Sequence, residues 1–202
     1  MNQVKMIAKV IKAAECCDQG RVSENESNCK IDNSEDSFLE LHDVICVAAG
    51  NKPLAALDFS TLGKSKLKKT NIQLKNFAIK YANNNNVEML HNKKTGGMYL
   101  KTIFFLPENY DNALKLMYVL WYGSKLKMTG VELQIAIGLL LGYSNANISH
   151  FIRIRYNFDK AKKVPIAKVT NALKKMKITL EDLQKDHKIV HLKDIPSLTK
   201  KS

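Results

Sequence analysis

The chain has 202 residues, 45% of them hydrophobic, which is enough to bury the core of one good-sized domain. Its 32 lysines and arginines against 19 acidic residues give a formal net charge of +13. Four cysteines are too few for a disulfide scaffold, and the longest apolar stretch, residues 135–143, is too short to span a bilayer. Composition therefore argues against a disulfide-rich secreted domain and against a helical membrane protein.

The positive charge is concentrated in the second part of the chain. Residues 1–64 hold 7 basic and 10 acidic side chains, whereas residues 65–202 hold 25 basic and 9 acidic ones. Such an excess suggests a polyanionic partner, because basic side chains that neutralise phosphates release counterions. The alternative is a solvated lysine surface, since all but three of the basic residues are lysines.

The residue pattern of the N-terminal part predicts two helices separated by a flexible loop. Apolar residues recur at helical spacing over 3–17, and the lysines among them are too frequent for a signal peptide. Residues 18–36 are polar and acidic, which predicts a flexible loop. A capping-box pattern at Ser37 and Glu40 then starts a helix that ends near Gly50. We therefore expect an N-terminal helical segment over 1–50. The lack of a signal-peptide pattern predicts an intracellular protein, located in the cytoplasm or nucleus of a host cell or in a virion.

The middle of the chain contains one β signal. A helix is predicted over 71–82, and the asparagines at 83–86 end it. Two short β-rich runs follow and flank Gly96 and Gly97, which predicts a β-hairpin over 87–106. Its loop has the lysine and glycines of a phosphate loop, but in the wrong order.

The rest of the chain predicts helices. Apolar spacing gives a helix over 109–122, and Thr129 with Glu132 forms a second capping box. Further helices are expected at 145–156 and, after Pro165, through the lysine-dense region, while Thr179 can cap a last short helix. The predicted fold is mainly α with one small β-hairpin, in the α+β class. It has a basic, mostly helical core over 70–180 and a basic C-terminal tail over 181–202.

The most specific segment is 131–156, with the sequence VELQIAIGLLLGYSNANISHFIRIRY. Its small residue Gly138, turn residue Gly142 and branched residue Ile148 have the spacing found in the helix-turn-helix of DNA-binding regulators. The run Leu-Gly-Tyr-Ser that includes Gly142 resembles the Leu-Gly-Val-Ser turn of that family. A small residue lets two helices cross closely, and the glycine can adopt a positive φ. The predicted fold therefore contains a helix-turn-helix-like pair.

The resemblance implies roles for the second helix. Ser144 would cap it, and Ile148, Phe151 and Ile152 would pack inward. The residues implied to face the groove of DNA are Asn145, Asn147, Ser149, His150 and Arg153. Those implied to contact the phosphate backbone are Arg155, Lys160, Lys162 and Lys163. Helix-turn-helix proteins are often dimers, so the resemblance is compatible with a homodimer, although the sequence itself does not indicate the oligomeric state.

A second interpretation treats the same pair of helices as an ordinary core hairpin. The protein would then be a non-enzymatic helical structural or protein-interaction protein. The abundance of Lys and Asn, the asparagines at 83–86 and the acidic loop resemble proteins of large AT-rich DNA viruses. This resemblance implies a viral protein and no particular activity.

Candidate sites for catalysis or metal binding are weak. The cysteines and His42 include a single pair with metal-ligand spacing, His42 and Cys46, and that pair lies on a helix with an apolar face. His187 and His191 have the spacing of two ligands on one helix, but a third ligand is missing. We therefore expect no metal, no cofactor and no enzymatic activity.

Overall fold

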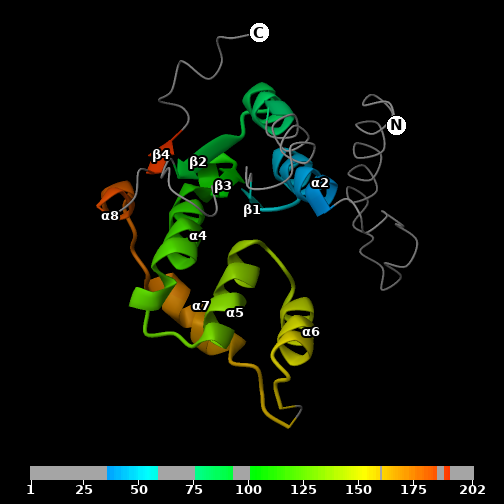
Figure 1. Cartoon of the computed structure of the whole chain (residues 1–202), viewed down its shortest axis with the longest axis vertical. Coiled ribbons are helices and arrows are strands. Elements are labelled where there is room, and N and C mark those ends of the chain that lie inside the picture. Colours follow the sequence, from blue (N-terminus) through cyan, green and yellow to red (C-terminus); the bar gives the residue numbers. More distant parts are fainter. Residues whose placement is uncertain (1–35, 59–75, 93–100, 160, 186–188, 192–202) are drawn as a thin grey trace, which may run out of the picture.

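The computed structural model describes residues 36–58, 76–92, 101–159, 161–185 and 189–191 (Figure 1). Most of these residues are helical, and a small antiparallel sheet crosses the molecule, which confirms the predicted mainly α fold with a small β part. No helix in these ranges is long and apolar enough to cross a membrane. The predicted helix 3–17 and nearly all of the loop 18–36 lie outside the described residues.

The sheet has four strands in the order β1-β3-β2-β4. The predicted hairpin 87–106 supplies β2 (Glu88–Asn92) and β3 (Lys101–Phe105), which pair antiparallel with Leu90 opposite Ile103. The strand β1 (Leu54–Asp58) pairs with the other side of β3, and the strand β4 (Ile189–His191) pairs with β2. The sheet is therefore larger than the single hairpin that the sequence predicts.

The two outer strands change the interpretation of two segments. The predicted tail 181–202 contains β4 and most of the short helix α8 (Leu180–Gln184). In β4, Nε2 of His191 lies 2.9 Å from Oε2 of Glu88 in β2. His191 therefore lies in a strand and contacts Glu88, while His187 lies outside the described residues.

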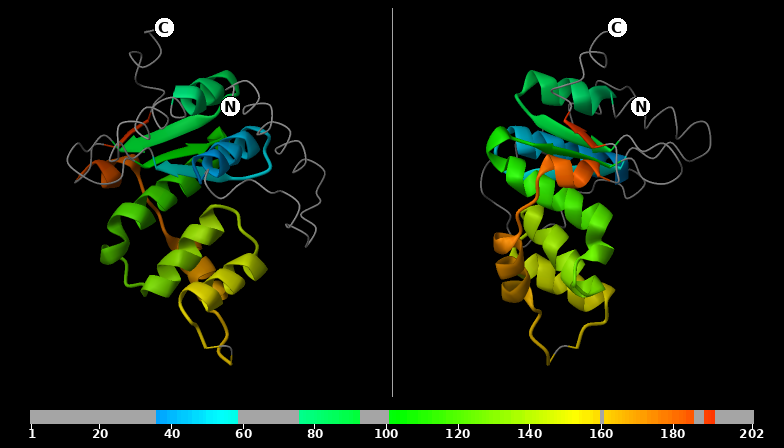
Figure 2. Two further views of the ribbon diagram at one scale, coloured as in Figure 1. Left: turned by 45° about the vertical axis from the view of Figure 1, so that its right-hand side comes forward. Right: turned by 90° about the vertical axis from the view of Figure 1, so that its left-hand side faces the viewer.

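Both faces of the sheet are covered, which is why its central strand is apolar at consecutive positions. Ile103 and Phe105 of β3 point to the side of α4 (Tyr110–Tyr122). Phe104 points to the opposite side, where α2 (Asp36–Ala48) and the helical residues 76–84 pack. In Figures 1 and 2 the helix 76–84 lies above the sheet and α4 lies below it. The segment 1–50 thus contributes α2 to the smaller core cluster, on the Phe104 side of the sheet.

Three helices form a further layer beyond α4: α5 (Gly130–Leu140), α6 (Asn145–Arg155) and α7 (Ile166–Lys175). Their boundaries agree with the predicted helices, and Thr129, Ser144 and Pro165 occupy the predicted helix starts. Figure 2 shows this layer at the end of the molecule away from the sheet. We call the described residues of 123–178 the helical half and the remaining described residues the sheet half.

Candidate nucleic-acid interface

The helix α5 is fixed at its start by side chains that the sequence identifies. The hydroxyl of Thr129 accepts a hydrogen bond from the backbone N–H of Glu132, and the Glu132 carboxylate accepts one from the N–H of Thr129, at 3.3 and 2.8 Å. The same carboxylate lies 2.6 Å from Nζ of Lys168 in α7. The hydrogen bond from Lys168 is the main reason why the pKa of Glu132 is lowered.

The turn between α5 and α6 has the predicted backbone geometry. Gly142 adopts a φ of +83°, and the N–H groups of Gly142 and Tyr143 donate to the carbonyls of Leu139 and Gly138. These two bonds form a Schellman ending of α5, which requires a residue that tolerates a positive φ. The hydroxyl of Ser144 then accepts from the N–H of Asn147 at 3.2 Å and caps α6.

The two helices cross closely at Gly138. A Cβ atom added to Gly138 would lie 2.9 Å from Cγ1 of Ile148, which is closer than real Cβ contacts. Ile148 and Ile152 are buried and hold α6 against α5. The spacing of Gly138, Gly142 and Ile148 thus forms the local geometry that the sequence predicts.

The turn also contacts the start of β1 in the sheet half. A Cβ atom added to Gly142 would lie 2.6 Å from Cδ of Pro53. Next to it, Nζ of Lys52 lies 4.7 Å from the centre of the Tyr143 ring and 2.6 Å from Oδ2 of Asp43. These contacts fix the turn against the sheet half, and with it the start of α6.

Most of the residues that the sequence assigns to DNA contact are exposed in the structure. On α6, Ser149 and Arg153 are half-buried, whereas Asn145, Asn147, His150 and Arg155 are exposed. Lys162 and Lys163 are exposed in the loop after α6, and Lys160 lies outside the described residues. The structure therefore brings the described members of the set to one helix and the loop that follows it.

Arg153 has a role that the sequence does not suggest. Its guanidinium donates hydrogen bonds to the carbonyl oxygens of Asp159 and Lys162, at 3.1 and 3.2 Å. The carboxylate of Asp159 in turn accepts from the N–H of Ala161 at 2.9 Å. Arg153 thus holds the loop that carries Lys162 and Lys163 against the end of α6.

One prediction about the packing of α6 is wrong. Phe151 was expected to pack inward, but 48% of it is exposed. It belongs to a group of large apolar residues that are strongly exposed, with Tyr143 at 45%, Ile154 at 69% and Tyr156 at 41%. The sequence contains the signal, because the apolar residues of 148–156 occupy a wider arc of a helix than one packing partner can cover.

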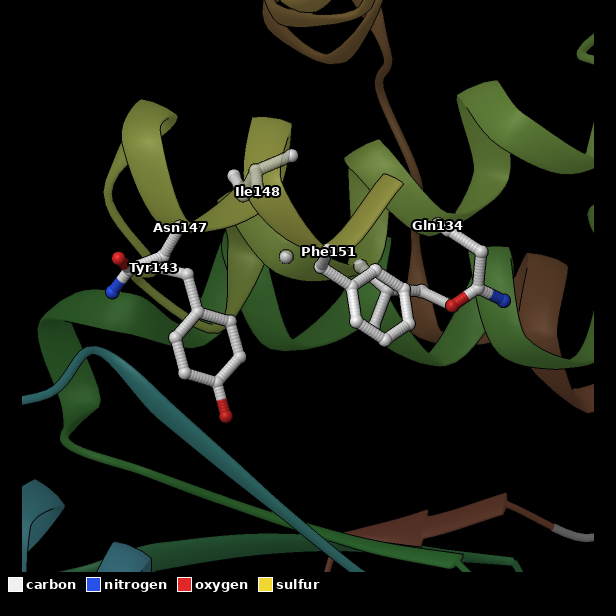
Figure 3. A pocket seen from close by; sticks show the side chains of 7 residues that line it. Gln134, Tyr143, Asn147, Ile148 and Phe151 are labelled. Atoms are coloured by element: carbon white, nitrogen blue, oxygen red, sulfur yellow. The ribbon is translucent and has the colours of Figure 1, made fainter. Parts of the chain in front are cut away.

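A pocket of about 330 Å³ opens between the two helices on the side of Phe151 (Figure 3). It is lined by Gln134, Ile137 and Gly138 of α5, by Tyr143 of the turn, and by Asn147, Ile148 and Phe151 of α6. Figure 3 shows the rings of Tyr143 and Phe151 pointing to the same side of the helix pair. Sequence patterns alone did not identify this pocket, because its lining comes from three separate elements.

Metal ligands do not gather in the part of the chain that the structure describes. No group of three or more His, Cys, Asp or Glu side chains there could hold a metal ion. His42 and Cys46 do lie together, with the sulfur 3.7 Å from the imidazole nitrogens. These two side chains alone do not form a metal site.

Comparisons with known proteins gave no relative from which a function could be transferred. No protein-family model, no curated protein and no solved structure matches this chain.

Proposed function

We propose that this protein binds nucleic acid, with α6 as the helix that enters the major groove of duplex DNA. The observation that carries the proposal is that α6 is packed on one side and exposed on the other. Ile148 and Ile152 attach one side of the helix to α5, while the opposite side is exposed along its whole length. A recognition helix needs this arrangement, because it must be rigid and yet accessible to base edges.

The charge of the helical half supports the same proposal. Residues 123–178 hold eleven basic side chains and two acidic ones. Both acidic side chains have structural partners, since Glu132 pairs with Lys168 and Asp159 accepts from the loop backbone. Residues 123–178 therefore carry a formal net charge of +9 (11 basic minus 2 acidic), and such an excess attracts phosphates and raises the rate of association.

The proposal gives each side chain a role. Asn145, Asn147 and His150 are the exposed polar groups of α6 that can hydrogen-bond to base edges, with Ser149 beside them. Arg155, Lys162 and Lys163 are exposed and would contact phosphates, and the proposal gives the same role to Lys160, which lies outside the described residues. Arg153 acts by positioning the lysine loop.

A second candidate function is favoured by the exposed apolar residues. Tyr143, Phe151, Ile154 and Tyr156 form an unusual concentration of apolar surface within one short segment. Exposed apolar residues that cluster together often mark a protein-binding surface. The protein would then be an interaction protein, and a second copy of this chain is one partner that this surface could take.

A salt series separates the two functions. We expect the purified protein to bind duplex DNA at low salt, with an affinity that falls steeply as salt rises. Replacing Lys162 and Lys163 by alanine should lower the affinity and reduce the salt slope by about 2, close to one for each phosphate contact. The matched control removes two charges from the sheet half, by Lys80→Ala and Lys185→Ala, and should bind almost as the parent does.

Two results would contradict the proposal. The first is the absence of binding to duplex DNA at low salt. The second is an equal loss of affinity in both double variants, because the positive charge near α6 would then have no special role. If the protein self-associates and the substitution Ile154→Glu abolishes this association, the result would instead support the function as an interaction protein.

A further inference from the structure

The pocket between α5 and α6 has walls that differ from its surroundings. The two rings of Tyr143 and Phe151 line it on one side, and its floor is apolar at Ile137, Gly138 and Ile148. No charged side chain lines it, although the helical half around it is strongly basic. The pocket therefore suits a ligand with two parts: a neutral part that enters the pocket and a negatively charged part that stays at the basic surface outside it.

Two side-chain amides give the pocket polar ends. The lining includes Gln134 from α5 and Asn147 from α6, and Figure 3 shows their amide groups on opposite flanks of the two rings. A carboxamide offers a donor and an acceptor side by side. It can therefore pair with the edge of a nucleobase, as Asn and Gln do with adenine.

The size of the pocket fits a small ring system. A volume of about 330 Å³ lies at the lower end of the range for ligand sites in proteins. Aromatic side chains bind unpaired bases by stacking on their faces. The absence of a side chain at Gly138 adds to the depth of the pocket, because a Cβ there would meet Ile148 and approach the Tyr143 ring to 3.9 Å.

We infer that this pocket binds one unpaired nucleobase of the nucleic acid, stacked on Phe151 and Tyr143 and hydrogen-bonded by Asn147 or Gln134. The inference rests on the proposed function and makes it more specific. The preferred partner is then a duplex that presents an unpaired base next to the segment that α6 contacts. The base leaves the helix stack for the pocket, while its phosphates stay at the basic surface.

The test compares a continuous duplex with the same duplex carrying one unpaired adenine. We expect the protein to bind the second duplex more tightly. When 2-aminopurine replaces the unpaired adenine, its fluorescence should change on binding, because the base exchanges stacking on its neighbours in the duplex for stacking on the two rings. Phe151→Leu keeps an apolar side chain but removes the ring, and should weaken binding of the unpaired-base duplex by about 5- to 150-fold.

Two controls distinguish the ring from general apolar surface and from folding. Ile154→Ala removes a more exposed apolar side chain that does not line the pocket, and should leave the preference for the unpaired base unchanged. Circular dichroism melts of Phe151→Leu should match the parent, because half of this side chain is already exposed.

Each outcome bears on the inference. Equal affinity for the two duplexes, or a Phe151→Leu variant that keeps both the preference and the fluorescence change, overturns the base pocket. The proposed function survives that result if binding still depends on salt and on Lys162 and Lys163. If neither duplex binds at low salt, both the base pocket and the proposed function are wrong.

Discussion

The sheet half and the helical half of the molecule use their apolar residues in opposite ways. In the sheet half, neighbouring residues of β3 are buried on both faces, with Phe104 on one side and Phe105 on the other. In the helical half, α6 buries Ile148 and Ile152 but exposes Phe151 and Ile154. The sheet half therefore buries its apolar residues in a core, whereas the helical half leaves several large apolar residues at the surface.

The largest expected effect tests this contrast directly. Phe104→Ala should lower the free energy of unfolding by about 3–5 kcal/mol, because it leaves a cavity in a core that is covered on both faces. Phe151→Ala should change it by less than about 1 kcal/mol, since this ring is half exposed. Urea unfolding of both variants measures the difference. Similar losses would mean that α6 is part of the core and that the contrast is wrong.

A smaller effect is expected where α5 and α6 cross. Gly138→Ala should lower the free energy of unfolding by about 1 kcal/mol, because its overlap with Ile148 costs more than the gain in helix propensity. Gly130→Ala is the matched control in the same helix, because no atom lies within 4 Å of its added Cβ. It should be neutral or slightly stabilising. Equal effects in thermal melts would show that the close crossing is absent.

The ion pair of Glu132 and Lys168 predicts a dependence on pH. The pKa of Glu132 is lowered in the folded protein, so its stabilising contribution is complete above the ordinary value of 4.5 and is lost as pH falls through the folded value. Glu132→Gln should reduce the free energy of unfolding at neutral pH by about 1 kcal/mol, a typical cost for a weakened helix cap. The difference from the parent should shrink in acid. An unchanged difference in acid would contradict this role of the carboxylate.

The smallest expected effect concerns the loop after α6. Arg153→Lys keeps the charge but loses the planar group that donates to both Asp159 and Lys162. Stability should change by less than about 1 kcal/mol. Limited proteolysis should nevertheless cut the loop faster, and affinity for duplex DNA should fall modestly. Cleavage at the parental rate would show that the two hydrogen bonds do not hold the loop.

Local signals predicted the helical half well, because they act over a few residues. The capping box at Thr129, the positive φ of Gly142 and the cap at Ser144 all depend on neighbours in the chain. Such signals show that α6 must expose some of its apolar residues, but they do not predict the exposure of Phe151 in particular. It depends on which surface faces α5, and apolar residues on two sides of one helix leave that choice open.

Only the part of the sheet that depends on neighbours in the chain was predicted. The hairpin of β2 and β3 joins strands that are close in sequence, whereas β1 and β4 pair across long separations. The three residues of β4 are too few to give an alternating pattern, and only their pairing with β2 makes them a strand. The pocket could not be predicted from the sequence either, because it forms only when α5, the turn and α6 pack together.

The position of β4 in the chain has a consequence for biosynthesis. Translation produces β2 about a hundred residues before the strand that covers its outer edge, so a nascent chain carries that edge uncovered while the whole helical half is made. An open sheet edge invites pairing with other chains. Premature termination shortly after α8 would leave a product that contains every helix the structure describes but lacks β4. The exposed edge of β2 would make this product prone to bind chaperones or to aggregate.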